Sequence, residues 1–409
     1  MSPYSETNTT LLFALVLLSV IFSCRRTDDP PAPCIGVTVD KSPLNLKWST
    51  PGTNSHSFAR TFPIQWKDKV VFGDGNFPQR IVCYDGVLET LIWEVTIEGL
   101  VTDDNLKLSG DKLYWANDRA LWSLDLNSAT PAKVCEFGQG YISRDFALWN
   151  DVAFCSLHMC IPPCDTLTGV GYRVDIQTGT YQEVYRKVQR RAAQYSNVLL
   201  DPIISTNSDG DTLFCFMESD IVSPSYDYLN RFVCVNLTRG ITAYSPPALY
   251  YFYHYYTGTL NVHDGKAYVP IGDTVYCFST ENGATLWQRP MPRTWLTIKE
   301  GYLIASPDGW ETIVNLDLDD GHIIWRSGYV GYNIAQFQPT FVENGHFYFI
   351  GEYALCAVDL TNGCLLSRRY APVTPPYNGN LSNGLALSSD GKTIYLRQYP
   401  NLIAAVFSD

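Results

Sequence analysis

Two groups of polar residues have spacings that could bind a metal ion. The first combines three cysteines and a histidine, Cys155, His158, Cys160 and Cys164. Thiolates and imidazoles are zinc ligands, but the paired Cys-x₂-Cys spacing of structural zinc sites is missing. A local disulfide, or simply reduced thiols, therefore explains this cluster better than a metal does.

The second group has the spacing of the oxygen ligands in an EF-hand calcium loop. Positions 1, 3, 5 and 12 of such a loop are matched by Asn207, Asp209, Asp211 and Glu218. However, Thr212 stands where the loop requires glycine, and the apolar residues 213–216 that follow are typical of a strand. We therefore expect a hairpin turn here, and no metal site in either group.

Other chemistry finds no support in the residue pattern. The sequence has no glycine-rich phosphate loop and no Gly-x-Ser-x-Gly elbow, and its six histidines are scattered. The net charge of -12 argues against a nucleic-acid partner, because phosphate binding needs a positive face. The sequence therefore predicts no catalytic residue, no resident cofactor and no nucleic-acid binding.

The N-terminus has the pattern of an export signal. Residues 11–22 form an apolar run of 12 residues, whereas a helix that spans a bilayer needs about 20. Residues 21–24, Ile-Phe-Ser-Cys, resemble the lipobox of bacterial lipoproteins, in which the cysteine becomes the acylated first residue. The resemblance implies lipidation of Cys24, a signal peptide over residues 1–23 and a polar tether over residues 24–43. An ordinary cleaved signal peptide is the alternative, and export in either form permits disulfides.

The elements that must position any site come from a repeat. A turn followed by an apolar, alternating strand recurs at Asp68-Lys69, Gly110-Asp111, Asn150-Asp151, Asp209-Gly210, Asp264-Gly265, Glu300-Gly301, Asn344-Gly345 and Asp390-Gly391. Turn residues between β-favouring runs are the strongest local hairpin signal. Eight copies at steps of 36 to 59 residues indicate a repeat architecture.

A second pattern follows each turn: a strand ending in an anchor residue, a polar turn, and a tryptophan eight positions after the anchor. The best copies are Asp85 with Trp93, Ser279 with Trp287, and Asp317 with Trp325. Other copies replace the tryptophan, as in Asp359 with Ser367, Asn236 with Tyr244, Asp175 with Glu183, and Asp125 with Lys133. Small residues recur two positions before the anchor, Cys83, Cys234 and Cys277 among them, which predicts a tight packing position.

One such unit cannot bury both faces of its sheet, so successive units must stack like the blades of a β-propeller. Seven units are complete, and an eighth begins at Asp390 and stops before its tryptophan strand. Near the other end, Trp48 lies in a strand without a partner. Pairing that strand with the C-terminal unit would close the ring and remove both edges. The sequence therefore predicts an all-β, eight-bladed β-propeller over residues 44–409, with seven blades as the alternative.

The repeat of apolar strand, Asp, polar turn with Gly, and Trp resembles the tryptophan-docking repeat of PQQ-like (quinoprotein-type) β-propellers. Its best copies are residues 357–363, 316–325 and 278–287. As a lipoprotein with eight such blades, the chain also resembles the propeller subunit of the outer-membrane β-barrel assembly machinery. That subunit is a non-enzymatic scaffold. The resemblance implies a bacterial cell-envelope location, at the outer membrane, and a protein partner.

Quinoprotein dehydrogenases of this family use an Asp base, a calcium ion and often a disulfide between adjacent cysteines. This chain has no Cys-Cys pair, and nothing singles out a base or a calcium cage. We therefore expect no cofactor, and a PQQ-dependent oxidoreductase with calcium remains the alternative function.

An aromatic run at residues 250–256 is the most unusual segment. Its residues include Tyr251, Tyr253 and Tyr255, and tyrosines combine a flat apolar surface with a polar tip. The run could fill gaps between blades, or it could bind a sugar, a peptide or a partner protein. The longest repeats contain the loops at 155–171 and 218–231, where an added function would lie. The leading prediction is a lipid-anchored propeller that binds a protein partner, and a carbohydrate-binding lipoprotein is a further alternative.

Overall fold

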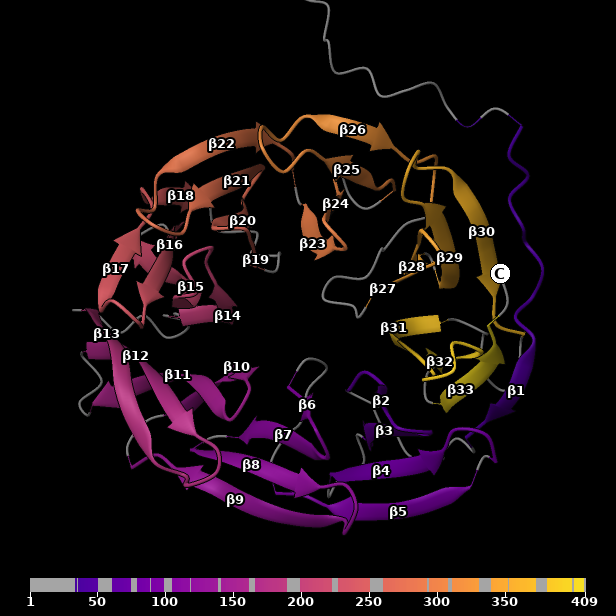
Figure 1. Ribbon diagram of the computed structural model, residues 1–409, viewed down its shortest axis with the longest axis horizontal. Coiled ribbons are helices and arrows are strands. Elements are labelled where there is room, and N and C mark those ends of the chain that lie inside the picture. The colour runs from indigo at the N-terminus through magenta and orange to yellow at the C-terminus, as the bar shows by residue number, and fades with distance from the viewer. Residues whose placement is uncertain are drawn as a thin grey trace, which may run out of the picture.

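The computed structural model describes residues 34, 36–50, 61–74, 79–88, 90–98, 105–117, 119–138, 141–161, 166–189, 199–222, 227–250, 260–292, 294–307, 311–330, 340–351, 353–372, 381–398 and 401–407. These residues form strands and turns and contain no helix, so the described part has no helix that could cross a membrane. The strands form eight antiparallel sheets, arranged as the blades of a ring (Figure 1).

Each of blades 1 to 4 runs through its strands in chain order, from the centre of the ring outward. Blade 1 contains β2 (Ile64–Trp66), β3 (Lys69–Asp74), β4 (Arg80–Asp85) and β5 (Leu91–Thr96), and blade 2 contains β6 (Lys107–Ser109), β7 (Lys112–Asn117), β8 (Ala120–Asp125) and β9 (Thr130–Glu136). Blade 3 contains β10 (Tyr141–Trp149), β11 (Val152–Ile161), β12 (Thr166–Asp175) and β13 (Tyr181–Gln189). Blade 4 contains β14 (Leu199–Thr206), β15 (Thr212–Val222), β16 (Asp227–Asn236) and β17 (Ile241–Tyr244), and β18 (Ala248–Tyr250) also pairs with β16.

Blades 5 to 7 repeat this order. Blade 5 contains β19 (Asn261–His263), β20 (Lys266–Ile271), β21 (Thr274–Ser279) and β22 (Thr285–Pro290), and blade 6 contains β23 (Trp295–Lys299), β24 (Tyr302–Ser306), β25 (Val314–Leu316) and β26 (Ile323–Arg326). Blade 7 contains β27 (Phe341–Glu343), β28 (His346–Gly351), β29 (Ala354–Asp359) and β30 (Leu365–Tyr370). Blade 8 contains β31 (Leu381–Leu387), β32 (Thr393–Gln398), β33 (Asn401–Val406) and, as its outermost strand, β1 (Leu46–Ser49).

The ring closes through the two ends of the chain. Strand β1 pairs antiparallel with β33, and Trp48 lies opposite Ala404. In Figure 1 the indigo strand β1 completes the yellow blade 8. This arrangement confirms the predicted eight blades and their closure, because one strand from the start of the chain covers the edge that β33 would otherwise expose.

The hydrophobic core is divided among the interfaces between neighbouring blades. The middle strands bury almost every side chain, as in β7, β20 and β28, because both of their faces are covered. The outermost strands bury few side chains, as in β5, β9 and β22, since one of their faces meets solvent. Successive sheets therefore stack as the repeat requires, and the turns between strands remain at the two faces of the ring.

The segment just before β1 is attached to blade 7. Asp40 forms an isolated bridge with Ser367, its N–H donates to Leu366 O at 2.9 Å, and its carboxylate pairs with Arg369. A disulfide joins Cys34 to Cys364. The described part of the predicted tether, residues 34 and 36–43, therefore runs along the outside of blade 7 and is fixed to it at Cys34 and Asp40 (Figure 1).

Candidate binding surface beside blade 4

The tryptophans of the repeat lie between blades. Trp287 in blade 5 and Trp325 in blade 6 are buried, and their indole N–H groups donate to main-chain carbonyls of the next blade, Leu318 O at 3.2 Å and Leu360 O at 2.7 Å. Each ring covers a glycine in the turn of that next blade. For Trp325 the glycine is Gly363, where an added Cβ would come within 2.5 Å of the ring. Each indole therefore joins two blades through apolar contact and one hydrogen bond.

The other two predicted tryptophans also lie at interfaces. Trp48 of blade 8 donates its indole N–H to Gly86 O in blade 1 at 3.2 Å and stacks on Tyr84. Trp93 is half-buried and packs on the cluster of apolar side chains between blades 1 and 2. The tryptophans therefore stabilise the ring, and none of these four lines a described cavity.

The anchor residues form turns. Asp85 Oδ1 accepts hydrogen bonds from the main-chain N–H groups of Val87 and Leu88, at 2.8 and 2.7 Å. Asp317 binds the amides of its own turn in the same way, and Asp359 accepts from Thr361 N–H at 2.7 Å. A carboxylate that accepts amide hydrogen bonds two and three residues on is an Asx-turn. The spacing of the anchors thus reflects hairpin geometry and not acid–base chemistry.

Strand register shows which residue replaces the tryptophan in the other blades. We define the docking position as the residue directly opposite the one that lies two places before the anchor. Trp93, Trp287 and Trp325 occupy it in blades 1, 5 and 6, opposite Cys83, Cys277 and Asn315 respectively. In blades 2, 3 and 4 it is occupied by Ala132, Gln182 and Ala243, opposite Ser123, Arg173 and Cys234 respectively. In blade 7 it is occupied by the predicted Ser367, opposite Ala357.

For blades 2, 3 and 4, this register corrects the prediction that the docking residue lies eight positions after the anchor. In blades 1, 5 and 6 a β-bulge in the outermost pair lies directly beside the tryptophan and adds a residue. In blade 4 strands β16 and β17 pair without a bulge, so Ala243 and not Tyr244 faces blade 5. In blade 3 the bulge lies further along, so Gln182 and not Glu183 takes the docking position. Residue counting alone could not find these shifts.

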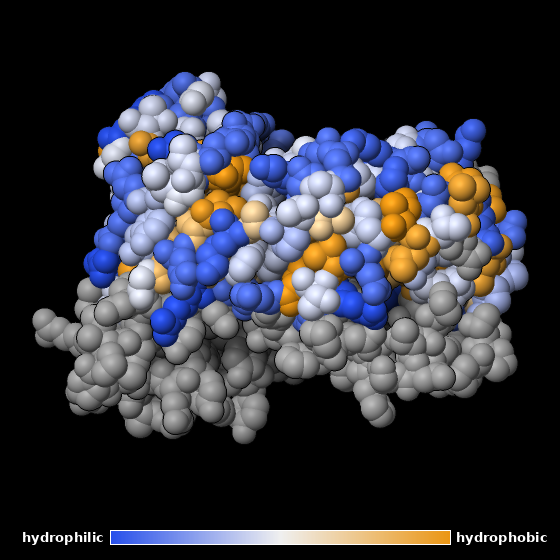
Figure 2. Space-filling view, turned by 90° about the horizontal axis from the view of Figure 1, so that it is seen from below, coloured by the Kyte–Doolittle hydropathy of each residue, from blue (hydrophilic) through white to orange (hydrophobic). Residues whose placement is uncertain are grey.

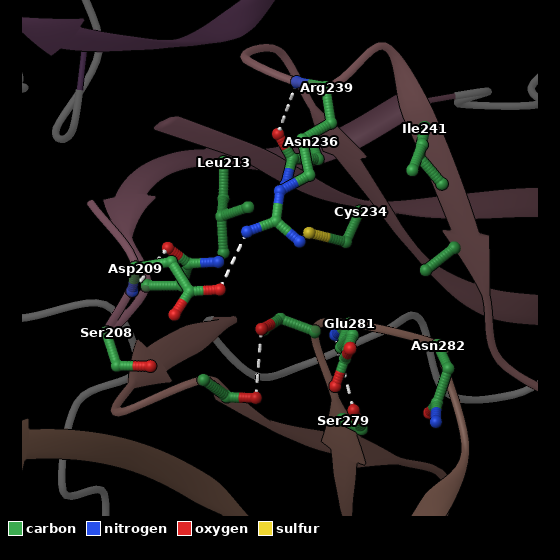
Figure 3. Close-up of a pocket in the computed structure, with 14 residues that line it drawn as sticks. Ser208, Asp209, Leu213, Cys234, Asn236, Arg239, Ile241, Ser279, Glu281 and Asn282 are labelled. Carbon is green, nitrogen blue, oxygen red and sulfur yellow. Dashed lines mark hydrogen bonds and ion pairs between the residues drawn. The ribbon is translucent and has the colours of Figure 1, made fainter. Parts of the chain in front are cut away.

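A groove of about 590 Å³ lies at the interface of blades 4 and 5, next to Ala243. Its apolar part is formed by Leu213, Cys234, Ile241 and Ala243, and its rim by the polar turns at 207–209, 236–239 and 279–282. Figure 3 shows Arg239, Asp209, Glu281 and Cys234 among the side chains that line it, with Arg239 directed toward Asp209. The groove is not a copy of the indole slot, because an added Cβ on Gly283 would meet the carbonyl oxygen of Tyr244 at 2.1 Å.

Charged groups fix one wall of this groove. The guanidinium of Arg239 pairs with Asp209 at 2.7 Å and also with Asp211, and the hydrogen bond that it donates to Asp209 is the largest cause of the raised pKa of Arg239. Asp211 accepts from the side-chain amide of Asn236 at 2.9 Å, which is the main cause of its lowered pKa. With Glu281 on the opposite side, the rim carries more negative than positive charge. It therefore favours ligands with basic groups.

A second groove of about 380 Å³ lies on the other side of blade 4, at the interface with blade 3. It is lined by Gln182 in the docking position, by the Arg173 opposite it, and by Trp149, Thr212 and Leu237. Trp149 is partly exposed there. Both described grooves thus lie at interfaces where the docking position holds a residue other than tryptophan.

The structure separates the residues of the EF-hand-like group. Asn207 Oδ1 accepts from the main-chain N–H groups of Asp209 and Asp211 at 3.1 and 2.8 Å, which forms the expected hairpin turn. Glu218 lies further along β15, where it contacts Tyr185 and Arg231.

Cys155 of the other group is fully buried in blade 3. The side chains of His158 and Cys160 lie outside the described residues, as do Cys164, Cys24, Tyr251, Tyr253 and Tyr255.

Two further features were not foreseen from the sequence. Within the described ranges, one group of three potential metal ligands comes together, Asp317, Asp320 and His322, in an exposed turn of blade 6 whose carboxylates accept from turn amides. Blade 1 exposes four aliphatic side chains at one hairpin, Val87 (76%), Leu88 (69%), Leu91 (47%) and Ile92 (42%). Figure 2 views the ring from the side of blades 1 and 2 and shows apolar residues between hydrophilic ones there.

The C-terminal part of the chain matches a known family. Residues 255–408 match the family described as "Outer membrane protein assembly factor BamB". The structure of BamB from Moraxella catarrhalis matches with a TM-score of 0.53 at 13% identity, over 89% of this chain and 100% of that one. The chain has the β-propeller fold of the BamB structure, and its C-terminal part is similar to the BamB family.

Two other solved structures match with TM-scores below 0.5, so we base no inference on them. One is the Mitotic Checkpoint Complex, with a TM-score of 0.44 at 10% identity over 92% of this chain and 100% of that one. The other is the dihydro-heme d1 dehydrogenase NirN in complex with DHE, with a TM-score of 0.48 at 13% identity over 90% of this chain and 72% of that one. No curated protein sequence matches the chain significantly.

Proposed function

We propose that this propeller is a lipid-anchored protein of the bacterial cell envelope that acts as a non-catalytic scaffold for a protein partner. The resemblance to BamB supports an envelope role, and the lipobox-like residues ending at Cys24 support the anchor. Nine residues lie between Cys24 and Cys34, which is attached to blade 7, so the ten residue steps would hold the ring within about 35 Å of the membrane surface.

The observation that carries the binding role is the pair of grooves beside blade 4. Three consecutive blades lack tryptophan in the docking position, and both grooves lie on this side of the ring. An apolar floor with a polar, mainly acidic rim matches the anatomy of protein-binding surfaces. Because the sheets on both sides are closed into a ring, the partner would meet a preformed surface and little binding energy would be lost to ordering.

The quinone alternative does not fit the described residues. PQQ enzymes of this family hold calcium with oxygen ligands, and the described group of potential ligands, at Asp317, lies in an exposed turn whose carboxylates already bind its own amides. We therefore derive no step through a quinone.

The test uses a photo-crosslinking amino acid placed in the full-length protein in its own envelope. At Ile241, which lines the larger groove, we expect crosslinks to a discrete partner. At Ile324, a similarly exposed aliphatic residue in blade 6, we expect none. Equal crosslinking at both positions would contradict a specific surface at blade 4.

Filling the groove provides the matched control. The Ala243→Trp variant should abolish the crosslinks from Ile241, because the indole would occupy the groove, whereas Ala132→Trp at the equivalent position of blade 2 should leave them unchanged. Separately, Cys24→Ala should release the protein from the membrane fraction. Loss of crosslinks in both tryptophan variants, or retention of Cys24→Ala protein in the membrane, would overturn the respective part of the proposal.

A further inference from the structure

Two buried cysteines of blade 4 face each other across neighbouring strands. Cys215 on β15 lies directly opposite Cys234 on β16, and their sulfur atoms are 3.0 Å apart. Both are thiols here, with exposed fractions of 0% and 1%. Cys277, the corresponding residue of blade 5, has Tyr268 and not a cysteine opposite it, so the pair is specific to blade 4.

The backbone geometry at this pair suits a disulfide. Leu237 N–H donates to Thr212 O, and the register from residue 213 to 222 runs without a bulge. Hydrogen-bonded and non-hydrogen-bonded residue pairs alternate along two antiparallel strands. Because 212–237 is a hydrogen-bonded pair, 215–234, three pairs further along, is a non-hydrogen-bonded pair, in which the Cα atoms are about 4.5 Å apart. That separation lies within the 4.4–6.8 Å that disulfides span, and both side chains point to the same face of the sheet, toward blade 5.

We propose that Cys215 and Cys234 form a structural disulfide when the protein matures in an oxidising compartment. The disulfide between Cys34 and Cys364 indicates such a compartment independently of any function. The reaction is thiol–disulfide exchange with a donor disulfide: the two thiols lose two protons and two electrons, one S–S bond forms, and the donor is reduced to two thiols.

Burial decides when this bond can form. The thiolate is the attacking species, and burial raises the pKa of the Cys215 thiol well above its usual value. In the folded ring Cys215 is fully buried, and Cys234, although it lines the larger groove, is only 1% exposed, too little for a disulfide donor to approach its sulfur. Exchange must then precede the docking of blade 5 on blade 4. A chain that folds in a reducing environment should then keep both thiols and resist later oxidation.

The bond would lie directly under the larger groove. Cys234 lines that groove, next to Leu213 and Ala243, and a covalent link between β15 and β16 would fix its floor. The bond would close the loop from 215 to 234, which contains the 218–231 segment, and would restrict the unfolded chain.

The experiment is a thiol map of the full chain after export, by alkylation with N-ethylmaleimide under denaturing conditions with and without prior reduction. We expect a linked peptide pair containing Cys215 and Cys234, and an alkylated Cys277 as the unpaired control. Alkylation of both Cys215 and Cys234 without reduction, in protein whose Cys34–Cys364 bond is intact, overturns the proposal. This map does not depend on any partner, so its outcome is separate from that of the scaffold role.

Two further preparations test the timing. Protein unfolded and refolded with oxidised glutathione should gain the 215–234 bond, whereas folded, reduced protein incubated with the same reagent should not. Oxidation of the folded protein at an equal rate would contradict the role of burial. The Cys234→Ser variant should make Cys215 alkylatable after export and lower Tm by several degrees relative to the oxidised protein.

Discussion

The blade interfaces of this ring fall into two kinds, those with a docked indole and those without one. The interfaces without one run consecutively from blade 2 to blade 5, and Ser367 of blade 7 is a further case. Where blades 5, 6 and 7 meet, an indole such as Trp325 covers a glycine of the next blade and donates to its backbone. Where blades 2 to 5 meet, the docking position holds Ala132, Gln182 or Ala243. Tryptophan docking is thus one way of stacking the sheets, and the two described grooves both lie at interfaces that lack it.

Polar and aromatic contacts stabilise one of the interfaces without a docked indole. Glu218, fully buried on β15, accepts from Tyr185 of blade 3, pairs with Arg231, and lies 3.2 Å from Lys187 Nζ. Burial, with the nearby carboxylate, raises the pKa of Tyr185 far above its usual value, so the phenol remains a donor. Phe154 and Phe214 stack across the same interface. The blade 3–4 interface is thus stabilised by a buried ionic cluster in place of an indole.

The largest expected effect comes from removing a docked indole. Trp325→Ala should lower the free energy of unfolding by about 4 kcal/mol, because it empties a buried site and leaves Leu360 O without its donor. Trp149→Ala, in the smaller groove, should cost about 1 kcal/mol, since that side chain is partly exposed. Denaturant unfolding of both variants measures the difference. Equal losses would remove the distinction between the two kinds of interface.

The ionic cluster should show nearly as large an effect. Glu218→Gln leaves Arg231 and Lys187 without their buried counter-charge and should cost about 3 kcal/mol. The matched control is Glu94→Gln, whose partner Arg80 lies in a partly exposed pair, and it should cost less than about 1 kcal/mol. If Glu218→Gln is as mild as the control, the cluster does not stabilise blades 3 and 4.

A glycine comparison tests the close approach of the indole. Gly363→Ala should cost about 3 kcal/mol, because its φ of 77° is strained for alanine and the new Cβ would clash with Trp325. Gly110→Ala has a similar φ of 58° but open space around it, and should cost about 1 kcal/mol. Thermal unfolding of the two variants isolates the clash. A Gly363→Ala variant no less stable than Gly110→Ala would show that the indole can move away.

The fold could be predicted from the sequence because each repeat contains turn residues and, in several copies, a tryptophan, and hairpin geometry determines the spacing of these residues. The sequence located the closure at Trp48 for the same reason. It did not locate the grooves, because they depend on whether a β-bulge lies between the anchor and the outer strand, as the change from Tyr244 to Ala243 shows. The contact between Glu218 and Tyr185 joins residues of different blades, and no local pattern predicts it.

The smallest expected effect concerns a contact between blades 1 and 2. The indole N–H of Trp66 donates to Asp111 Oδ1 at 2.9 Å and is the first cause, before Lys67 and Asn127, that lowers the pKa of Asp111 from 3.8 to about 2. Trp66→Phe should raise that pKa, as measured by NMR titration of the carboxyl carbon, whereas Asp125, which binds amides of its own turn, should keep its lowered pKa.

The same contact predicts a pH dependence of stability. Because the folded-state pKa of Asp111 is lowered, the bound carboxylate stabilises the fold fully above about pH 4, and this contribution is lost as the pH falls toward 2. Wild-type protein should therefore lose its stability advantage over Trp66→Phe across that interval, and the advantage should be constant from pH 5 to 7. An advantage that does not change between pH 5 and 2 would mean that Trp66 contributes only by packing against its apolar neighbours, and that the hydrogen bond to blade 2 adds nothing to the interface.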